Sequence, residues 1–217
     1  MSEQTRTRSV PALSLLFAVN TMNFFDRQIL GAINEPIRRD WGLSDTQLGW
    51  LVTAFTLLYA AAGIPLGRLA DIWCRNSILT IGLTLWSGLT FLSGLCRDFW
   101  SLFAVRLGVG IGEASCAPAS TSLIGDLFPA RARARALSVY MMGLPAGLAL
   151  SYIVSSTVAQ HYGWRFAFYV AGIPGLLLAA FTLLLREPQR GAAELRDVGA
   201  ARRPGSAYLL VLGIPTM

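Results

Sequence analysis

The sequence predicts an all-α membrane protein in which six transmembrane helices form one bundle. Three observations carry this prediction: 54% of the 217 residues are hydrophobic and 14% are charged, the mean hydropathy is +0.53, and the apolar residues lie in long stretches. Soluble domains have about a quarter of their residues charged, so lipid is the solvent that this composition fits. The composition argues against a soluble globule, a disordered chain, a coiled coil and a collagen-like fibre.

Six stretches are long enough to cross a bilayer as helices, because a hydrocarbon core of about 30 Å needs about 20 residues. None alternates polar and apolar residues as a barrel strand does. The first stretch holds polar groups and lacks a small-residue cleavage site, so we expect a retained span and not a removed signal. The predicted spans are 11–33, 47–68, 77–96, 99–126, 136–160 and 164–185.

The remaining segments complete the predicted organisation. Residues 1–10 are a cytoplasmic N-terminus, and residues 11–185 are the six-helix bundle. Residues 186–204 are charged and lack apolar periodicity, which is typical of a cytoplasmic linker. Residues 205–217 become apolar again, as at the start of a seventh span, but they are too few to cross a bilayer. We therefore expect the first half of a longer protein with a truncated seventh span.

The arginines predict the orientation of the bundle. All 18 basic residues are arginine, and with the N-terminus inside, most of those outside the spans fall on the cytoplasmic side. The positive-inside rule then places both termini in the cytoplasm. Because the arginines do not form one basic face, nucleic acid is not an expected partner. The lack of lysine, with many Ala and Gly residues, is typical of a GC-rich genome. We expect the protein to lie in a bacterial inner (plasma) membrane. The arginines on the opposite side are Arg38, Arg39, Arg97 and Arg165.

The cysteines and the single histidine argue against a metal site. Cys74, Cys96 and Cys116 stand about twenty residues apart with no C-x-x-C pair, and His161 is the only histidine. This spacing also argues against a disulfide framework. We expect neither a metal nor a cofactor.

Four ionisable residues lie inside the predicted spans, where each costs about 2.5 to 3.5 kcal/mol to insert. They are Asp26 and Arg27 in the first span and Arg106 and Glu113 in the fourth. Helical geometry places Asn20, Asn23 and Arg27 on one face, with Asp26 about 100° from Arg27. Two acids and two bases can pair across the two helices and largely cancel the cost of burial.

Two interpretations stay open for this cluster. Either the ion pairs pin the first span against the fourth as a structural element, or Glu113 is a proton switch that engages Arg106 on the same face. We favour the switch, because a purely structural pair inside lipid can be replaced by apolar packing at little cost.

Small residues and prolines mark places where helices approach or bend. Gly108 and Gly112 form a small-x-x-x-small pair in the fourth span, and Gly143, Pro145 and Gly147 lie together in the fifth. Such residues are typical of close helix packing or of bends in membrane helices. We expect a packing or bending role for all five.

The segment between the second and third spans resembles the cytoplasmic loop signature of the major facilitator superfamily. It has Gly67, then Asp71 four residues on, then Arg75 four residues beyond that. Asp71 and Arg75 at this spacing can form an ion pair that holds one state of a cytoplasmic gate. Ile72, Cys74 and Asn76 depart from the usual pattern, which predicts a weaker latch.

A second set of motifs resembles the Spinster branch of that superfamily, from about residue 20 to residue 185. It comprises Phe24 to Arg27, then Arg106, Gly110, Gly112, Glu113, Ala114 and Ser115, then Asp126 to Phe128 and Arg135 to Ser138. The resemblance implies the N-terminal half of a twelve-span transporter. It also implies that Asp26 and Glu113 are the protonatable pair, with Arg27 and Arg106 as partners that face a central cavity together with Asn20 and Asn23. Candidate aromatic wall residues are Phe24, Tyr59, Tyr140 and Tyr152.

We therefore expect a secondary active, proton-coupled transporter that moves an amphipathic organic solute, such as a lysolipid or a sphingoid-like lipid, by alternating access. Its expected partners are the lipid bilayer, the small organic substrate, protons, and either the missing C-terminal six-span half or a second copy.

Two alternatives stay open. In the first, the chain is a non-transporting six-span fragment or assembly subunit. A facilitator cavity lies between two six-span halves, and this sequence supplies one of them. The more distant alternative is an intramembrane hydrolase that uses Ser115 with His161, although Ser115 lacks the G-x-S-x-G pattern of such enzymes. We expect no enzyme activity.

Overall fold

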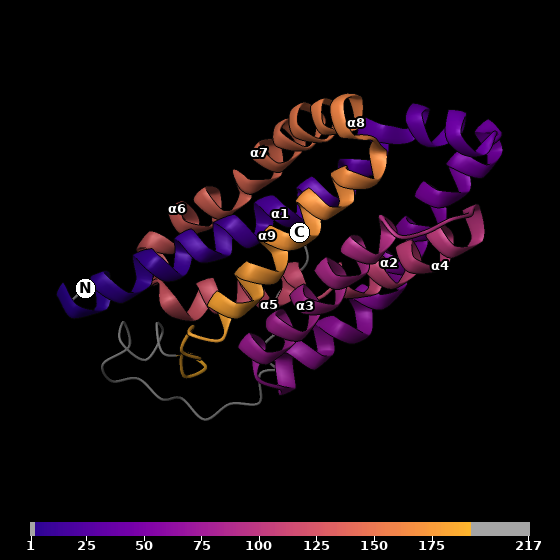
Figure 1. The fold of residues 1–217 in the computed structure, drawn as a ribbon. Coiled ribbons are helices and arrows are strands. Elements are labelled where there is room, and N and C mark those ends of the chain that lie inside the picture. Colours follow the sequence, from indigo (N-terminus) through magenta and orange to yellow (C-terminus); the bar gives the residue numbers. More distant parts are fainter. Residues whose placement is uncertain (1–2, 192–217) are drawn as a thin grey trace, which may run out of the picture.

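The computed structural model describes residues 3–191, and every regular element in this range is a helix. The helices run roughly along one direction and form an elongated bundle (Figure 1). The all-α prediction is confirmed for the described residues. In chain order the elements are α1 (Glu3–Trp41), α2 (Asp45–Ile72), α3 (Arg75–Ser93), α4 (Phe99–Glu113), α5 (Cys116–Leu127), α6 (Ala130–Met141), α7 (Gly143–Leu150), the π-helical turn η1 (Ser151–Ser155), α8 (Ser156–Tyr162) and α9 (Trp164–Thr182).

The described elements make six helical passes. The elements α4 and α5 form one pass with a short break between them, and α6, α7, η1 and α8 form another. Each predicted span overlaps one of these passes. By length and apolar composition alone, three helical stretches qualify as membrane spans, namely Asp45–Ile72, Ala130–Tyr162 and Trp164–Thr182. The four ionisable residues of the sequence cluster lie on α1 and α4, outside these three stretches.

Local sequence determines where several helices begin. Ser44 caps α2 through a capping box with Gln47, and Asp98 caps α4 in the same way with Ser101. Such reciprocal bonds satisfy backbone N–H groups that the first helical turn leaves free. Gly163 has a φ of 91°, a value that favours glycine, and this residue forms the tight turn between α8 and α9.

Glycines lie where α4 crosses α3. A Cβ at Gly112 would lie 3.0 Å from the backbone nitrogen of Trp86, and one at Gly108 would lie 2.6 Å from Cδ1 of Leu89. The first contact is with backbone, so only glycine allows this approach without moving a helix. Both placements match the predicted packing role.

A second close approach joins α1 and α7. A Cβ at Gly143 would lie 3.0 Å from the backbone nitrogen of Thr21, and one at Gly147 would lie 2.9 Å from that of Phe25. Pro145 lies in the first turn of α7, directly after α6 ends. A proline nitrogen cannot donate the hydrogen bond that would continue the preceding turn, so its position fits this break.

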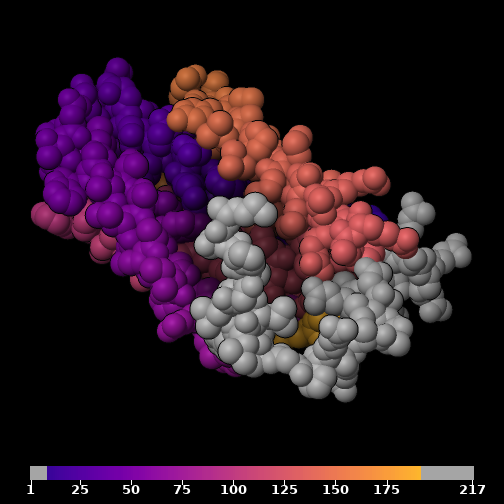
Figure 2. All heavy atoms as spheres, turned by 180° about the vertical axis from the view of Figure 1, so that it is seen from behind, coloured from indigo at the N-terminus to yellow at the C-terminus, as the bar shows by residue number. Residues whose placement is uncertain are grey.

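Burial differs strongly among the apolar passes. Within the most apolar window of each, 11% of α2, 22% of Ala130–Tyr162 and 39% of α9 is buried. Figure 2 shows α2 in purple and α6 to α8 in salmon and orange as two raised sides of one face, with α1 in indigo between them. The least buried apolar helices therefore flank α1 on this face.

One end of the bundle gathers several chain turns, and we call it the α2–α3 end. The hydroxyl of Ser9 on α1 donates to the carbonyl of Leu127 at 3.4 Å. The side chain of Asn76 at the start of α3 donates to the carbonyl of Leu185 at 2.8 Å. Of the predicted linker 186–204, the described residues include 186–191 only, and the predicted seventh span at 205–217 lies outside them.

Candidate functional site

The first buried ion pair joins α1 to α4. Arg106 donates from Nη1 to Oδ1 of Asp26 at 3.0 Å and from Nη2 to the backbone carbonyl of Asp26 at 3.3 Å. The hydroxyl of Thr90 on α3 donates to the other carboxylate oxygen. The side chains of Arg106 and Asp26 are 2% and 3% exposed. The pair therefore lies inside the six-helix bundle and ties three helices together.

The second ion pair also joins α1 to α4. Arg27 Nε lies 3.3 Å from Oε2 of Glu113, and Arg27 Nη2 donates to Oδ1 of Asn23 at 3.4 Å. Glu113 has no exposed surface, whereas the Arg27 side chain is 23% exposed. Oε1 of Glu113 is buried and has no hydrogen-bond partner within the described part of the chain. Arg27 is therefore the member of the four-residue cluster that reaches the protein surface.

Aromatic rings surround the guanidinium of Arg27. Its Cζ lies 4.2 Å from the ring centre of Tyr59, 5.0 Å from that of Phe24 and 6.0 Å from that of Phe55. Phe55 also lies 5.2 Å from the Arg106 guanidinium. Ring faces attract cations electrostatically. The aromatic residues therefore help to hold both arginines.

The geometry explains how two adjacent residues of α1 reach different partners. Asp26 and Arg27 are about 100° apart around the helix axis, so Asp26 contacts α3 and the middle of α4 while Arg27 contacts α2 and the end of α4. The predicted pairing of two acids with two bases across these helices agrees with the structure. One detail is wrong: Glu113 pairs with Arg27 and not with Arg106, because Arg106 is engaged by Asp26.

The structure also corrects the expectation that all four charges face a cavity. Asp26, Arg106 and Glu113 are at most 2% exposed. The six described helical passes alone bury them, so these three side chains do not line an open surface of the bundle. Asn20 is buried too, and its Nδ2 donates to the carbonyl of Tyr140 at 2.8 Å, so it ties α1 to α6. Asn23 lies beside Arg27 and is 3% exposed.

Of the four aromatic residues predicted to line the cavity wall, two contact Arg27 and two lie elsewhere. Phe24 and Tyr59 contact Arg27, but Tyr140 is only 1% exposed and lies against Cys116. Tyr152 is 45% exposed, and its hydroxyl lies beside Gly31. Thr90 and Phe55 were missed, because one hydroxyl or ring in an apolar span carries no signal that separates it from many others.

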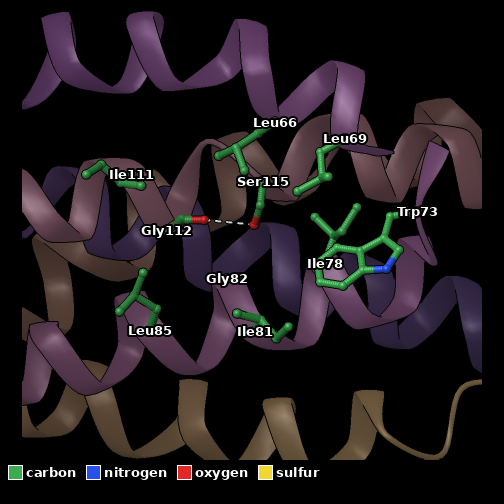
Figure 3. A pocket seen from close by; sticks show the side chains of 10 residues that line it. All are labelled: Leu66, Leu69, Trp73, Ile78, Ile81, Gly82, Leu85, Ile111, Gly112 and Ser115. Atoms are coloured by element: carbon green, nitrogen blue, oxygen red, sulfur yellow. Dashed lines mark hydrogen bonds between the residues drawn. The ribbon is translucent and has the colours of Figure 1, made fainter. Parts of the chain in front are cut away.

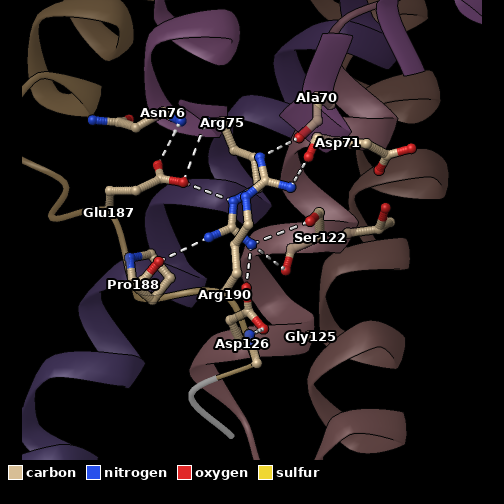
Figure 4. A network of polar contacts seen from close by, with 12 residues as sticks. Ala70, Asp71, Arg75, Asn76, Ser122, Gly125, Asp126, Glu187, Pro188 and Arg190 are labelled. Atoms are coloured by element: carbon tan, nitrogen blue, oxygen red, sulfur yellow. Dashed lines mark hydrogen bonds and ion pairs between the residues drawn. The ribbon is translucent and has the colours of Figure 1, made fainter. Parts of the chain in front are cut away.

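A second polar network lies at the α2–α3 end (Figure 4). Arg75 forms ion pairs with Asp126 at the end of α5 and with Glu187 after α9, the latter at 2.7 Å between Nε and Oε1. It also donates to Oγ of Ser122 at 3.2 Å and to the carbonyl of Pro188 at 2.8 Å. Arg75 is 1% exposed, so this arginine joins three segments of the chain.

The predicted ion pair between Asp71 and Arg75 is wrong. Asp71 lies in the last turn of α2 and Arg75 begins α3, with an extended Trp73 between them, so the two residues do not share one helix. Asp71 is exposed, and its backbone carbonyl accepts a hydrogen bond from Arg190. Gly67 has open space around it. The gate role of these residues stays a prediction.

Glu187 is the functional candidate that sequence reasoning missed at this end. Burial alone would raise the pKa of its carboxyl, but hydrogen bonds from the side chain of Arg75 and the backbone of Asn76 outweigh burial and hold the pKa below its usual value. No helical periodicity covers Glu187, so no pattern in the sequence pointed to it.

The residues of the hydrolase alternative do not meet. The hydroxyl of Ser115 donates to the carbonyl of Gly112 at 2.8 Å, among apolar side chains of α2, α3 and α4 (Figure 3). Nδ1 of His161 bonds to the carbonyl of Thr157, and His161 is exposed on α8. The described residues contain no cluster of His, Cys, Asp and Glu that could hold a metal ion.

These features define a class: an integral membrane protein of several helical passes with charge pairs sealed between its first and fourth passes. The model of the major facilitator superfamily matches residues 16–216, so the chain belongs to this superfamily.

Curated relatives show which branch of the superfamily the chain resembles. The chain is 36% identical over 195 residues to Protein spinster homolog 1 of Xenopus tropicalis, covering 87% of this chain and 37% of the relative. It is 35% identical over 190 residues to the Sphingosine-1-phosphate transporter SPNS2 of the same species, covering 86% and 37%. The chain thus spans little more than a third of these relatives' length. The Spinster-like assignment made from the motifs is confirmed.

Solved structures agree with this placement. A bacterial homologue of the human lysosomal transporter Spinster, in an inward-facing and unoccupied conformation, matches with a TM-score of 0.78 and 31% identity. The match covers 99% of this chain and 48% of that one. The chain therefore corresponds to about half of that fold, and these relatives are transporters and not enzymes.

Proposed function

We propose that this chain supplies the N-terminal half of a proton-coupled transporter for an amphipathic organic solute such as a lysolipid or a sphingoid-like lipid. Two ion pairs between α1 and α4 are the observation that carries the proposal. Of their four residues, only Arg27 reaches the surface. Charges buried this deeply in a membrane bundle are costly and mark functional positions.

The surroundings of Arg27 support an amphipathic substrate. A partly exposed guanidinium can bind a phosphate or carboxylate through two hydrogen bonds, and the neighbouring rings of Phe24 and Tyr59 offer apolar surface to the rest of the molecule. The name of the SPNS2 relative states that it transports sphingosine-1-phosphate, which combines an anionic head with an apolar chain. We carry this class of substrate over to the present chain as part of the proposal.

The pairing of Arg27 with Glu113 supports proton coupling. A proton on Glu113 removes the negative charge that holds Arg27, so the guanidinium becomes available to an anionic substrate. Loss of the proton restores the ion pair and releases the substrate. Asp26 keeps Arg106 neutralised throughout, so the Asp26–Arg106 pair holds α1 against α4 while the Arg27–Glu113 pair changes.

The proposal includes a location and a partner. The location is a bacterial inner membrane, and the arginine distribution supports an orientation with both termini in the cytoplasm. Since the chain spans about half of the solved homologue, a second six-helix half, from the rest of a longer chain or from a second copy, completes the cavity. The mostly exposed α2 and α6 to α8 supply apolar surface for it.

Transport by the full-length protein in proteoliposomes tests the proposal, with a fluorescent lysophosphatidylcholine and sphingosine-1-phosphate as probes. The wild type should respond to an imposed pH gradient, and Glu113→Gln should abolish that response. Glu35→Gln is the matched control, because Glu35 is 52% exposed and pairs with Arg39 on the protein surface. Gradient-driven transport by Glu113→Gln at the wild-type rate would remove Glu113 from the mechanism.

A non-transporting assembly subunit is the second candidate, favoured by the exposed apolar faces of a chain of this length. The mass of the native product, detected through an N-terminal tag, separates the two. A product of about twice 23.5 kDa supports a full transporter. A product of 23.5 kDa that stays monomeric and transports neither probe supports the subunit.

A further inference from the structure

The chain turns back on itself after α9, at the α2–α3 end. We call residues 185–191 the strap. The carboxylate of Glu187 accepts hydrogen bonds from the backbone N–H groups of Arg75 at 3.2 Å and Asn76 at 2.9 Å. These groups open α3, whose N-cap residue Cys74 makes no side-chain capping bond. Glu187 therefore supplies the cap that the local sequence of α3 lacks.

The strap also caps the helix on the other side of the turn. The guanidinium of Arg190 donates to the carbonyls of Ala70 at 2.9 Å and Trp73 at 2.7 Å, and to that of Asp71. These carbonyls close α2. A carboxylate at a helix N-terminus and a guanidinium at a helix C-terminus both complement the helix dipole. Two residues of the strap thus hold both ends of the α2–α3 turn (Figure 4).

A third attachment reaches α5. The backbone N–H of Gly191 donates to Oδ1 of Asp126 at 2.9 Å, while Arg75 pairs with the other oxygen of this carboxylate. Arg75 therefore lies between two carboxylates, one from α5 and one from the strap. With the strap docked, the ends of α2, α3 and α5 are bonded into one unit.

Leu185, the first residue of the strap, packs against the hydrophobic core, and the contacts given above for the residues after it are polar and lie at the protein surface. The Glu187 side chain is 30% exposed and Arg190 is exposed. By contrast, α9 ends on Thr182, which is fully buried and bonded to Thr80 on α3 at 2.8 Å. Because ion pairs in contact with water are weakened by salt, the strap can detach while α9 stays packed.

We propose that residues 185–191 form a releasable strap that sets the rigidity of the α2–α3 end. Docked, the strap locks the α2–α3 turn to α5. Released, it leaves α3 without its N-terminal cap, α2 without its C-terminal partner and Arg75 with Asp126 alone, so α2 gains freedom to move against α3. This device lies outside the α1–α4 charge cluster and does not depend on the proposed substrate.

Limited trypsin digestion of the purified full chain tests the strap, with the cut after Arg190 identified by fragment mass. A docked Arg190 cannot enter the protease pocket, because its guanidinium is bonded to α2. Glu187→Gln removes the charge-assisted bonds and should raise the rate of this cut about tenfold, whereas Glu35→Gln should leave the rate unchanged. An unchanged rate in Glu187→Gln overturns the proposal.

A cross-linked variant keeps the test decisive if Glu187→Gln misfolds. Sγ of Cys74 lies 3.5 Å from Oε2 of Glu187, so in Glu187→Cys a short bifunctional methanethiosulfonate can link the two thiols through a disulfide at each end, while Cys96 and Cys116 are buried. Raising the salt from about 0.05 to about 0.5 M should speed the cut after Arg190 in the wild type by screening the ion pairs. The cross-linked variant should resist cutting at both salt concentrations until the disulfides of the linker are reduced. Equal cutting of locked and reduced protein overturns the proposal.

Discussion

The two arginine networks of this chain hold similar charges in opposite surroundings. Between α1 and α4, Arg106 and Asp26 are 2% and 3% exposed. At the α2–α3 end Arg75 is equally buried, but its carboxylate partners Asp126 and Glu187 are 15% and 30% exposed. Water can replace a lost carboxylate at the second network but not at the first. Breaking an ion pair should therefore cost less at the α2–α3 end than at the Asp26–Arg106 pair.

The two networks also differ in how the chain assembles them. The inner network takes Asp26 and Arg27 from adjacent positions on one helix, and their partners lie two turns apart on α4. The outer network takes its members from a helix start, a helix end and a segment after the last helix. Packed helices fix the first arrangement, whereas the second depends on where the strap lies.

The largest expected effect is that of Asp26→Ala. The substitution leaves the guanidinium of Arg106 buried without a counter-charge, so we expect a loss of about 3 to 5 kcal/mol in the free energy of unfolding. Thermal or denaturant unfolding in detergent micelles measures this loss. Asp45→Ala is the control, since Asp45 is 89% exposed in its pair with Arg38. Equal stability of the two variants would show that Arg106 finds another partner, and the comparison would fail.

Glu113→Gln should destabilise the protein less than Asp26→Ala does. Its partner Arg27 is 23% exposed and can turn toward water, so the loss should be that of a charged hydrogen bond, about 1.5 to 3 kcal/mol. The same unfolding assay ranks the two variants. A larger loss for Glu113→Gln would mean that Arg27 is held as tightly as Arg106.

Gly112→Ala tests the packing that holds Glu113 in place. The new Cβ would lie 3.0 Å from the backbone nitrogen of Trp86 and 3.1 Å from the carbonyl of Gly82, so α3 and α4 must move apart at a cost of about 1 to 3 kcal/mol. Gly63→Ala is the matched control, because nothing lies near that position. The control should keep or slightly gain stability, since alanine favours a helix by up to about 1 kcal/mol. Equal behaviour of both variants would argue against a close α3–α4 contact.

The inner network was predictable from the sequence and the outer one was not. Charged residues stand out in an apolar span, and helical spacing predicts which of them share a face, so Asp26, Arg27, Arg106 and Glu113 could be named as one cluster. Which acid meets which base depends on helix rotation, so Glu113 was assigned to Arg106 instead of Arg27. At the α2–α3 end the helix boundary between Asp71 and Arg75 broke the expected i,i+4 pair. Glu187 lies 112 positions from Arg75, and no local pattern encodes such a contact.

The smallest effect concerns pH at the strap. Bonds from Arg75 and Asn76 hold the pKa of Glu187 below its ordinary value of 4.5. A carboxyl with a lowered pKa contributes stability that is fully present above its ordinary value and is lost as the pH falls through the lowered one. We therefore expect the backbone amides of Arg75 and Asn76 to keep constant hydrogen-exchange protection, corrected for intrinsic rates, from pH 8 to pH 6. Protection should fall below pH 4.5 by the equivalent of about 1 kcal/mol or less, because the pair is partly exposed. Glu187→Gln should show lower protection that does not change over this range. A wild type that stays protected in acid would mean that buried contacts, and not the carboxylate charge, hold the strap, and the two networks would then be alike.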